Sequence, residues 1–316
     1  MLDVIAVTAP IFIIMAIGYA AVRADLLAKA ELRALGKFVI NFALPALILK
    51  ALSQRPIAEI LNVPYLAVYA LGSVTVMLGG VAVAYFIRRR SLPVSALYGT
   101  GMAFPNSGFI GYPIVLQVLG APGLVALTLT MIVENMVLMP LAILLMESRA
   151  GSGDKAYRVA LAAFARLFRS PIILAIVAGF LLASFDLHPP APVARVIDML
   201  AAASGAVALF VIGGNLVGLE VKGMFGDVAL IMVGKLLLHP LAVFAALQLV
   251  PAFDPTLQRA AVMFACSPMM SIYPILGQKY GQEGFCSAAL MATTTASFVT
   301  ISSFLWLIEA SGYFAR

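Results

Sequence analysis

Apolar runs of about 20 residues recur along the whole chain, and short polar loops separate them. A helix that crosses the hydrocarbon core of a bilayer needs about 20 consecutive apolar residues. The pattern therefore predicts an all-α integral membrane protein with ten transmembrane helices. The predicted segments are approximately residues 4–22, 36–53, 65–87, 94–119, 123–146, 170–185, 200–219, 228–250, 258–281 and 285–309.

Composition and the placement of charge support a membrane location. The chain is 63% hydrophobic and 11% charged, whereas soluble domains carry about 25% charged residues. A net charge of +6 would suggest nucleic acid in a soluble protein, but here the cations gather in short loops. We therefore expect the lipid bilayer, and no nucleic acid, as a partner. The first segment carries Asp3 in place of a basic leader, so it is predicted to span and not to be a cleaved signal peptide.

The loops after odd-numbered segments hold most of the Lys and Arg residues, including Arg88–Arg90 and those within residues 147–169. By the positive-inside rule, these loops are predicted to be cytoplasmic and both termini periplasmic. Residues 147–169 alternate basic and apolar side chains after a Gly-Ser-Gly turn, which is typical of a linker followed by an interfacial amphipathic helix.

The chain repeats itself at an offset of 161 positions. Tyr112-Pro113-Ile114 recurs as Tyr273-Pro274-Ile275, and Pro10-Ile11 recurs as Pro171-Ile172. Five segments per half is an odd number, so the two copies must run in opposite orientations. The sequence thus predicts two inverted five-helix repeats, residues 1–146 and 170–316, joined by a cytoplasmic connector over residues 147–169.

The fourth and ninth segments are predicted to be broken near the middle of the membrane. Proline removes an amide donor and clashes with the preceding turn, and glycine adds backbone freedom. The predicted helix-breaking residues are Pro105, Gly111, Pro113, Pro268 and Pro274. A simple proline kink in each helix is the alternative, but matching positions in two repeats favour two full breaks that cross. Unwound backbone at that depth must line a cavity or be buried in protein.

The predicted breaks carry polar residues that could bind an anionic substrate. Four of them, Asn106, Ser107, Ser267 and Ser271, are also suited to cap the second half-helices, whose N-termini attract anions. In the second and seventh segments, Asn41 and Asn215 are expected either to face the substrate cavity or to brace helix contacts. The predicted substrate-binding set is Asn106, Ser107, Gly108, Ser267, Pro268, Met269, Asn41 and Asn215.

A second polar group is predicted to couple transport to H⁺ or Na⁺. It consists of Glu134, Asn135 and Lys235, because ionisable residues inside a span are expensive and suggest function. The alternatives are a structural pairing of Glu134 and a Lys235 that snorkels to the interface. His239 follows Lys235 by four positions and shares its helix face.

Enzymatic and metal-dependent functions are not expected. Both histidines, His188 and His239, are isolated from any nucleophile, and the chain contains no Gly-x-Ser-x-Gly motif. Cys266 and Cys286 lie in apolar segments without metal-ligand spacing, so no disulfide, metal or cofactor is predicted.

The chain resembles the auxin efflux carrier family, which includes PIN-type exporters and malonate or malate permeases. The match is carried by Asn106-Ser107-Gly108-Phe109-Ile110-Gly111-Tyr112-Pro113, by Asn135, and by Ser267-Pro268 with Gln278-Lys279-Tyr280-Gly281. The resemblance implies an architecture shared with sodium/proton antiporters and bile-acid symporters. Helices 1, 2, 6 and 7 would form a scaffold, and helices 3–5 and 8–10 a mobile transport domain.

The resemblance also implies a function. We expect a secondary transporter or facilitator of a small organic anion, a dicarboxylate such as malonate or malate or an auxin-like weak acid. It would act by elevator-type alternating access, as a homodimer in a bacterial inner membrane. A cation/proton antiporter-like ion carrier and a non-transporting membrane sensor remain the alternatives.

Overall fold

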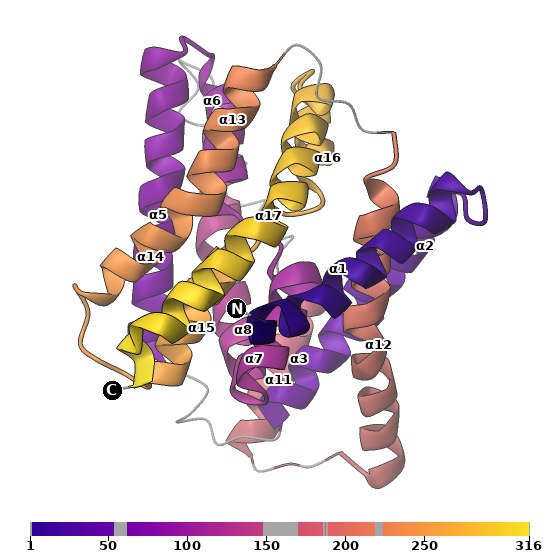
Figure 1. Ribbon diagram of the computed structural model, residues 1–316. Coiled ribbons are helices and arrows are strands. Elements are labelled where there is room, and N and C mark those ends of the chain that lie inside the picture. The colour runs from indigo at the N-terminus through magenta and orange to yellow at the C-terminus, as the bar shows by residue number, and fades with distance from the viewer. Residues whose placement is uncertain are drawn as a thin grey trace. The chain divides into compact units, whose positions relative to one another are not determined.

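The computed structural model describes residues 2–53, 62–147, 170–185, 187, 189–218 and 224–315 (Figure 1). All regular structure in these ranges is helical, apart from one isolated β-bridge. Each of the ten predicted segments overlaps a helix. The predicted connector, residues 147–169, lies outside the described residues except for Glu147.

The helices, with π-helical and 3₁₀ turns marked η, are α1 Leu2–Arg23, α2 Lys29–Phe38, η1 Val39–Ala43, α3 Leu44–Ser53, α5 Val63–Ala82, η2 Val83–Ile87, α6 Leu92–Ala103, η3 Ser107–Gly111, α7 Tyr112–Leu119, α8 Pro122–Val133, η4 Glu134–Leu138, α9 Met139–Glu147, α11 Pro171–Ser184, α12 Ala191–Asn215, α13 Phe225–Val233, η5 Gly234–Leu238, α14 His239–Leu247, α15 Pro255–Ala265, α16 Tyr273–Gln278, α17 Glu283–Ser311 and η6 Tyr313–Ala315.

Six continuous helices in the described residues are long and apolar enough to cross a membrane, and three shorter ones are apolar. The prediction of an all-helical membrane protein is therefore confirmed. Two helices begin well before their predicted starts. The helix that contains Asn41 begins at Lys29, and α12 begins at Ala191, after Pro190. In both cases polar residues within the first two turns, such as Lys29 and Glu31 in one helix and Arg195 and Asp198 in the other, lower the hydropathy there, so hydropathy alone placed the start too late.

Four π-helical turns share one local cause. The turns η1, η3, η4 and η5 each end two residues before a proline, namely Pro45, Pro113, Pro140 and Pro240. Proline cannot donate to the helical ladder, and its ring clashes with the carbonyl four residues earlier. A wider π turn accommodates that defect, and such turns recur at functional sites. Several of the polar residues singled out by the sequence lie in these turns.

The chain divides into two compact units. Unit 1 contains residues 1–63, 107–129 and 168–218, and unit 2 contains residues 64–106, 130–167 and 219–316. Unit 1 includes the predicted scaffold helices together with residues 107–129, which the family pattern would place in the transport domain. Within unit 1 those residues pack against α1 and α12.

Unit 1 is built on a close crossing of α1 and α12. A Cβ added at Gly213 would lie 1.8 Å from the Met15 carbonyl oxygen, and one at Gly18 would lie 2.0 Å from that of Phe210. Only glycine permits both contacts, so the two backbones approach as small residues allow in membrane helices. The α3 helix packs against both α11 and α12 and completes the unit.

Unit 2 holds α5, α6, α9 and the helices from α13 to α17. The Tyr273 hydroxyl donates to the Leu97 carbonyl at 3.0 Å, which ties the start of α16 to α6. In the loop that follows η2, at one end of unit 2, Arg90 donates a hydrogen bond to Asp227 at 2.9 Å. This hydrogen bond raises the pKa of the Arg90 guanidinium above its ordinary value.

Candidate functional site

Two helices of unit 2 stop abruptly at the predicted breaks. The α6 helix ends at Ala103, and Phe104 is extended, with φ −97° and ψ 106°. The α15 helix ends at Ala265, and helical structure resumes only at Tyr273. Pro105 and Pro268 lie inside the two breaks.

The other predicted helix-breaking residues lie at the edges of the interruptions. Pro113 and Pro274 occupy the first turns of α7 and α16. Gly111 closes the π turn η3. Proline is tolerated in a first turn, since its missing amide would be unpaired there anyway. Pro113 and Pro274 therefore start the second half-helices, whereas Pro105 and Pro268 lie just after the first half-helices have ended.

The two interrupted segments pair with each other. The Asn106 amide donates to the Pro268 carbonyl at 2.7 Å, and the Met270 amide donates to the Phe104 carbonyl at 3.1 Å. Pro105 and Met269 form an isolated antiparallel bridge between them. The backbone groups released by one break are thus satisfied by the other, which answers the requirement for hydrogen bonding inside a membrane. We call this pairing of residues 104–106 with 268–270 the crossover.

Two polar side chains, Asn106 in the crossover and Ser267 next to it, are in different states. The Asn106 side-chain amide donates to Ser271 Oγ at 2.7 Å, and Asn106 is 5% exposed. Ser267 is 1% exposed, and its hydroxyl has no hydrogen-bond partner in the described residues. A buried unpaired hydroxyl costs about 1–3 kcal/mol. Ser267 is therefore a group that a ligand could satisfy.

The predicted capping roles are wrong. The α7 helix is preceded by Gly111 and α16 by Ile272, and neither helix has a side-chain cap. The π turn η3 separates the first break from α7, so Asn106 and Ser107 lie too early in the chain to cap it. The Ser271 hydroxyl instead accepts a hydrogen bond from the side-chain amide of Asn106.

The remaining predicted substrate-binding residues belong to unit 1. Ser107 and Gly108 begin the π turn η3, where both are buried. The Asn41 amide donates to the Lys37 carbonyl of its own helix at 2.8 Å and is exposed. Asn215 is the exposed last residue of α12. Of the predicted set, unit 2 brings together Asn106, Pro268 and Met269 in the crossover and Ser267 next to it.

A buried hydrogen-bonded chain lies elsewhere in unit 2. Lys235 Nζ lies 2.6 Å from His239 Nδ1 and donates to the Ala265 carbonyl at 3.0 Å. His239 Nε2 lies 2.8 Å from the Ser73 hydroxyl. Lys235, His239 and Ser73 are each 0% exposed. The shared helix face of Lys235 and His239 is confirmed, and Lys235 does not snorkel to an interface.

Sequence reasoning missed two members of this chain. Ser73 is a small hydroxyl inside an apolar helix, and no local signal distinguishes it. The acceptor at Ala265 is a buried backbone carbonyl at the end of α15, where the helix no longer supplies a partner for it. Only the expectation that a buried amine must be hydrogen-bonded could have prompted a search for such partners.

Glu134 lies within electrostatic range of this chain. It is the first residue of η4, is 3% exposed, and interacts with both Lys235 and Tyr65. The Tyr65 hydroxyl in turn lies 2.6 Å from Thr130 Oγ1. Asn135 is placed differently, because its amide donates to the Met131 carbonyl of its own helix at 2.8 Å.

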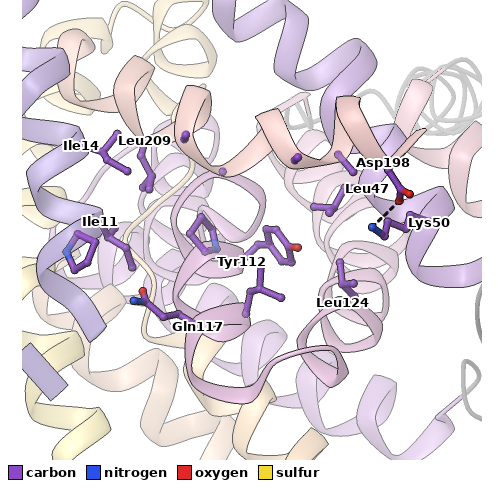
Figure 2. A pocket seen from close by; sticks show the side chains of 16 residues that line it. Ile11, Ile14, Leu47, Lys50, Tyr112, Gln117, Leu124, Asp198 and Leu209 are labelled. Carbon is purple, nitrogen blue, oxygen red and sulfur yellow. Dashed lines mark ion pairs between the residues drawn. The ribbon is translucent and has the colours of Figure 1, made fainter. Parts of the chain in front are cut away.

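Unit 1 contains a cavity of about 570 Å³ (Figure 2). Side chains from α1, α3, α7, α8 and α12 line it, and most of them are apolar. At one side, Lys50 Nζ forms an ion pair with Asp198 Oδ1 at 2.6 Å. In Figure 2 the Tyr112 hydroxyl is turned toward that side, whereas Gln117 lies near Ile11. The sequence did not single out Lys50 or Asp198, which come together only in the fold.

In the described part of the chain, no group of three His, Cys, Asp or Glu side chains is arranged to hold a metal ion. Cys266 and Cys286 are both buried free thiols.

Comparison with known proteins gives a consistent result. Residues 3–306 match the family described as Membrane transport protein (Mem_trans). The chain is similar to the "Putative malonate transporter" of Rhizobium meliloti (strain 1021), at 31% identity over 313 residues, covering 98% of this chain and 97% of the relative. It is also similar to the "Uncharacterized transporter YfdV" of Escherichia coli (strain K12), at 24% identity over 305 residues, covering 94% and 95%.

A mouse relative is longer. The "Lysosomal cholesterol signaling protein" of Mus musculus is 26% identical over 328 residues, which cover 94% of this chain but 36% of that protein. The resemblance to the auxin efflux carrier family is confirmed by the family match. That match is to a transporter family and not to an enzyme family.

Proposed function

We propose that this chain, which belongs to the membrane transport protein family, moves a small organic anion across a bacterial inner membrane as a secondary transporter or facilitator. Family membership makes it a multi-pass membrane transporter. The name of the Rhizobium relative supports a carboxylate such as malonate as the kind of solute.

The observation that carries the proposal is the unpaired, buried hydroxyl of Ser267 beside the crossover. A carboxylate oxygen could accept from this hydroxyl. The Asn106 amide could contribute as well, because Ser271 can donate to its oxygen once the amide is reversed, which leaves the NH₂ group for the anion. In a site of low dielectric, such contacts to a charged ligand are stronger than in water.

Helix dipoles contribute less than the sequence suggested. The α16 helix has only six residues, so few peptide dipoles are aligned behind its N-terminus. The anion is therefore proposed to be held mainly by side-chain hydrogen bonds at Ser267 and Asn106.

We further propose that Glu134 and Lys235 couple transport to H⁺ or Na⁺. Lys235 is an amine held inside unit 2 by His239 and Ala265, and Glu134 is a carboxylate within its electrostatic range. The carboxylate of Glu134 and the amine of Lys235 carry opposite charges and could exchange a cation during the transport cycle. Asn135 is the weaker candidate for ion coupling, because its side-chain amide donates to a carbonyl of its own helix.

Elevator-type movement is proposed to divide the chain between a scaffold and a transport domain. The grouping of α1, α2, α3, α11 and α12 in one compact unit supports the scaffold part of this division, and residues 107–129 belong to the same unit. We propose the inverted repeat, periplasmic termini and a homodimer as parts of the same account. Native mass spectrometry in nanodiscs tests the dimer, and a monomer there would contradict it.

Counterflow in proteoliposomes tests the function. Purified protein would be reconstituted with malonate, malate, benzoate and indole-3-acetate in turn, and labelled acid supplied outside. A carrier gives transient, saturable accumulation of label when the same acid is inside. Non-saturating flux would indicate a channel, and binding without flux would indicate a sensor; either result would overturn the proposal.

A further inference from the structure

Unit 2 contains an apolar groove of about 460 Å³ between α5 and the helices α13 and α14. Residues from 75 to 83 and from 230 to 242 line it, together with Met102 of α6. Among the described residues of the lining, Thr75 carries the one polar side chain, and the others are aliphatic, Met or Gly. We call this space the unit 2 groove. Its lining suits a hydrocarbon chain better than a polar solute.

The unit 2 groove is closed at its floor and open at its side. A Cβ added at Gly80 would lie 2.7 Å from Met102 Sδ, and one added at Gly234 would lie 2.5 Å from Met102 Cγ. The Met102 side chain therefore fills the floor between the two helices. A Cβ added at Gly79 would meet no atom of the described residues within 4 Å, and Leu241 is 51% exposed. In a bilayer, an apolar surface left open in this way is covered by lipid tails.

Three consecutive arginines, Arg88–Arg90, lie at one end of the groove, where η2 ends and α13 begins (Figure 1). All three are exposed. The backbone N–H of Arg88 donates to the Val83 carbonyl at 3.1 Å. The backbone N–H of Arg90 donates to the Ala84 carbonyl at 3.0 Å. The arginine loop is thus fastened to the end of the helix that forms one wall of the groove.

The arginine loop carries more positive charge than its acidic partner can balance. Arg90 lies 2.9 Å from one oxygen of Asp227, and Arg88 Nε lies 3.6 Å from the other. Asp227 is the one carboxylate among residues 83–98 and 225–234, so three cations and one anion leave two positive charges there. At 3.6 Å the contact of Arg88 is longer than a hydrogen bond. Its guanidinium can therefore donate to a phosphate, which arginine binds through paired hydrogen bonds.

The separation of the arginines from the groove fits the layers of a bilayer. Arg88 follows Val83, which lines the groove, by five positions, or about 7 Å at 1.5 Å per residue. The head-group layer of one leaflet is about 5–7 Å thick, half the difference between a whole bilayer and its hydrocarbon core. Tyr85 lies between them and is 44% exposed, and tyrosine is enriched at this level of membrane proteins. A lipid tail in the groove would thus have its phosphate at the arginines.

We propose that the unit 2 groove and the Arg88–Arg90 loop together bind one anionic phospholipid, with an acyl chain in the groove and the phosphate on the arginines. The proposed orientation places this loop on the cytoplasmic side, where the leaflet is negatively charged and basic pockets between helices bind such head groups. A zwitterionic lipid fits less well, because it brings a positive group to the same arginines. This ligand is separate from the transported anion and does not depend on the identity of that anion.

The test is native mass spectrometry of the full-length protein in detergent, titrated with dioleoyl phosphatidylglycerol or dioleoyl phosphatidylcholine. Phosphatidylglycerol should bind about 25-fold more tightly, since two net cations contribute about fivefold each. The double variant Arg88→Gln, Arg89→Gln should remove this preference. It keeps the hydrogen bond between Arg90 and Asp227, so the loop retains its attachment to α13.

The matched control for charge is Arg259→Gln, which should leave the preference unchanged. Arg259 pairs with Glu309 and belongs to neither the groove nor the arginine loop.

The groove itself is tested by filling it. Gly79→Leu places a side chain in the open space, and Thr75→Phe does so from another exposed position of the same wall. Both should abolish the tight binding of phosphatidylglycerol. Gly79→Ala is the matched control and should bind as the parent does, and size-exclusion elution checks that each variant is folded.

Equal affinity for the two lipids would overturn the inference. So would tight binding of phosphatidylglycerol that survives either the double arginine variant or both groove-filling variants. Glycerol 3-phosphate that displaces the lipid at an equal concentration would indicate a phosphate site without a lipid site, against the proposal. Loss of a dimer in Gly79→Leu would mean that a second copy of the chain covers the groove, and it would contradict the proposal as well.

Discussion

Replacement of Asn106 by alanine should weaken anion binding and leave the fold intact. The backbone pairing at the crossover uses the backbone N–H of Asn106 and the carbonyl of Phe104, and neither group depends on the Asn106 side chain. What the variant removes is the side-chain amide, which is 2.7 Å from Ser271 Oγ. The change is therefore confined to one polar group at the proposed anion site.

The magnitude follows from what that group can supply. A hydrogen bond to a charged partner contributes about 1.5–3 kcal/mol, and a neutral one about 0.5–1.5 kcal/mol. Taking a range of about 1–3 kcal/mol, and about 1.4 kcal/mol for each factor of ten, affinity should fall about 5- to 150-fold. Ser271→Ala removes only the partner of the amide, so its effect should lie near the lower end.

The assay is equilibrium binding of the panel acid that gives the largest counterflow signal, measured on purified protein in one lipid composition. Thr100→Val is the matched control. Thr100 is buried in α6 and donates to Ala96 of its own helix at 2.7 Å, so its hydroxyl is not available to a ligand. An Asn106→Ala variant that binds as tightly as Thr100→Val and the parent would refute the placement of the anion at the crossover.

Three further outcomes are expected. Glu134→Gln should preserve folding but change the pH or sodium dependence of counterflow; an unchanged ion dependence would reduce Glu134 to a structural partner. His239→Ala should destabilise the protein by about 2–4 kcal/mol, because it leaves Lys235 and Ser73 without their partner. Thermal unfolding measures this loss, with Ser184→Ala as the control, because the exposed Ser184 hydroxyl donates only to Phe180 of its own helix. An equal fall in melting temperature for both variants would refute the prediction. A Ser91→Cys variant, next to the Arg88–Arg90 loop, should resist impermeant thiol reagents added from the periplasm; labelling from that side would reverse the proposed orientation.

The sequence predicted the features that depend on local chemistry. Pro105 and Pro268 act on their own helices, so the two breaks could be located without knowledge of the fold. The four-residue spacing of Lys235 and His239 sufficed to place them on one face. The sequence therefore shows where these two helices must stop and that Lys235 and His239 share a helix face.

Features that depend on the meeting of distant segments were not predictable in this way. The pairing of residues 104–106 with 268–270 uses backbone groups, which no side-chain pattern reveals. Ser271 was predicted as a cap, but in the structure it is the acceptor for Asn106. Lys50 and Asp198 are far apart in the sequence, and only the packing of α3 against α12 places both at one cavity.

Hydropathy also misjudged helix starts wherever polar residues begin a helix. Arg195 and Asp198 made the first turns of α12 look like a loop, although the helix begins at Ala191. A helix can extend past the apolar core when Pro190 and Pro192 favour its initiation. For these two helices, the apolar length of the segment is thus shorter than the helix.

The most direct test of the central claim is substrate protection at Ser267. The protein would carry Ser267→Cys with Cys266 and Cys286 replaced by alanine, in proteoliposomes exposed to a membrane-permeant thiol reagent. If the transported anion is held at the crossover, saturating substrate should slow modification of this cysteine, with a half-maximal effect at the concentration that half-saturates counterflow. Modification at the same rate with and without substrate, in protein that still transports, would contradict the assignment of the anion site to the crossover.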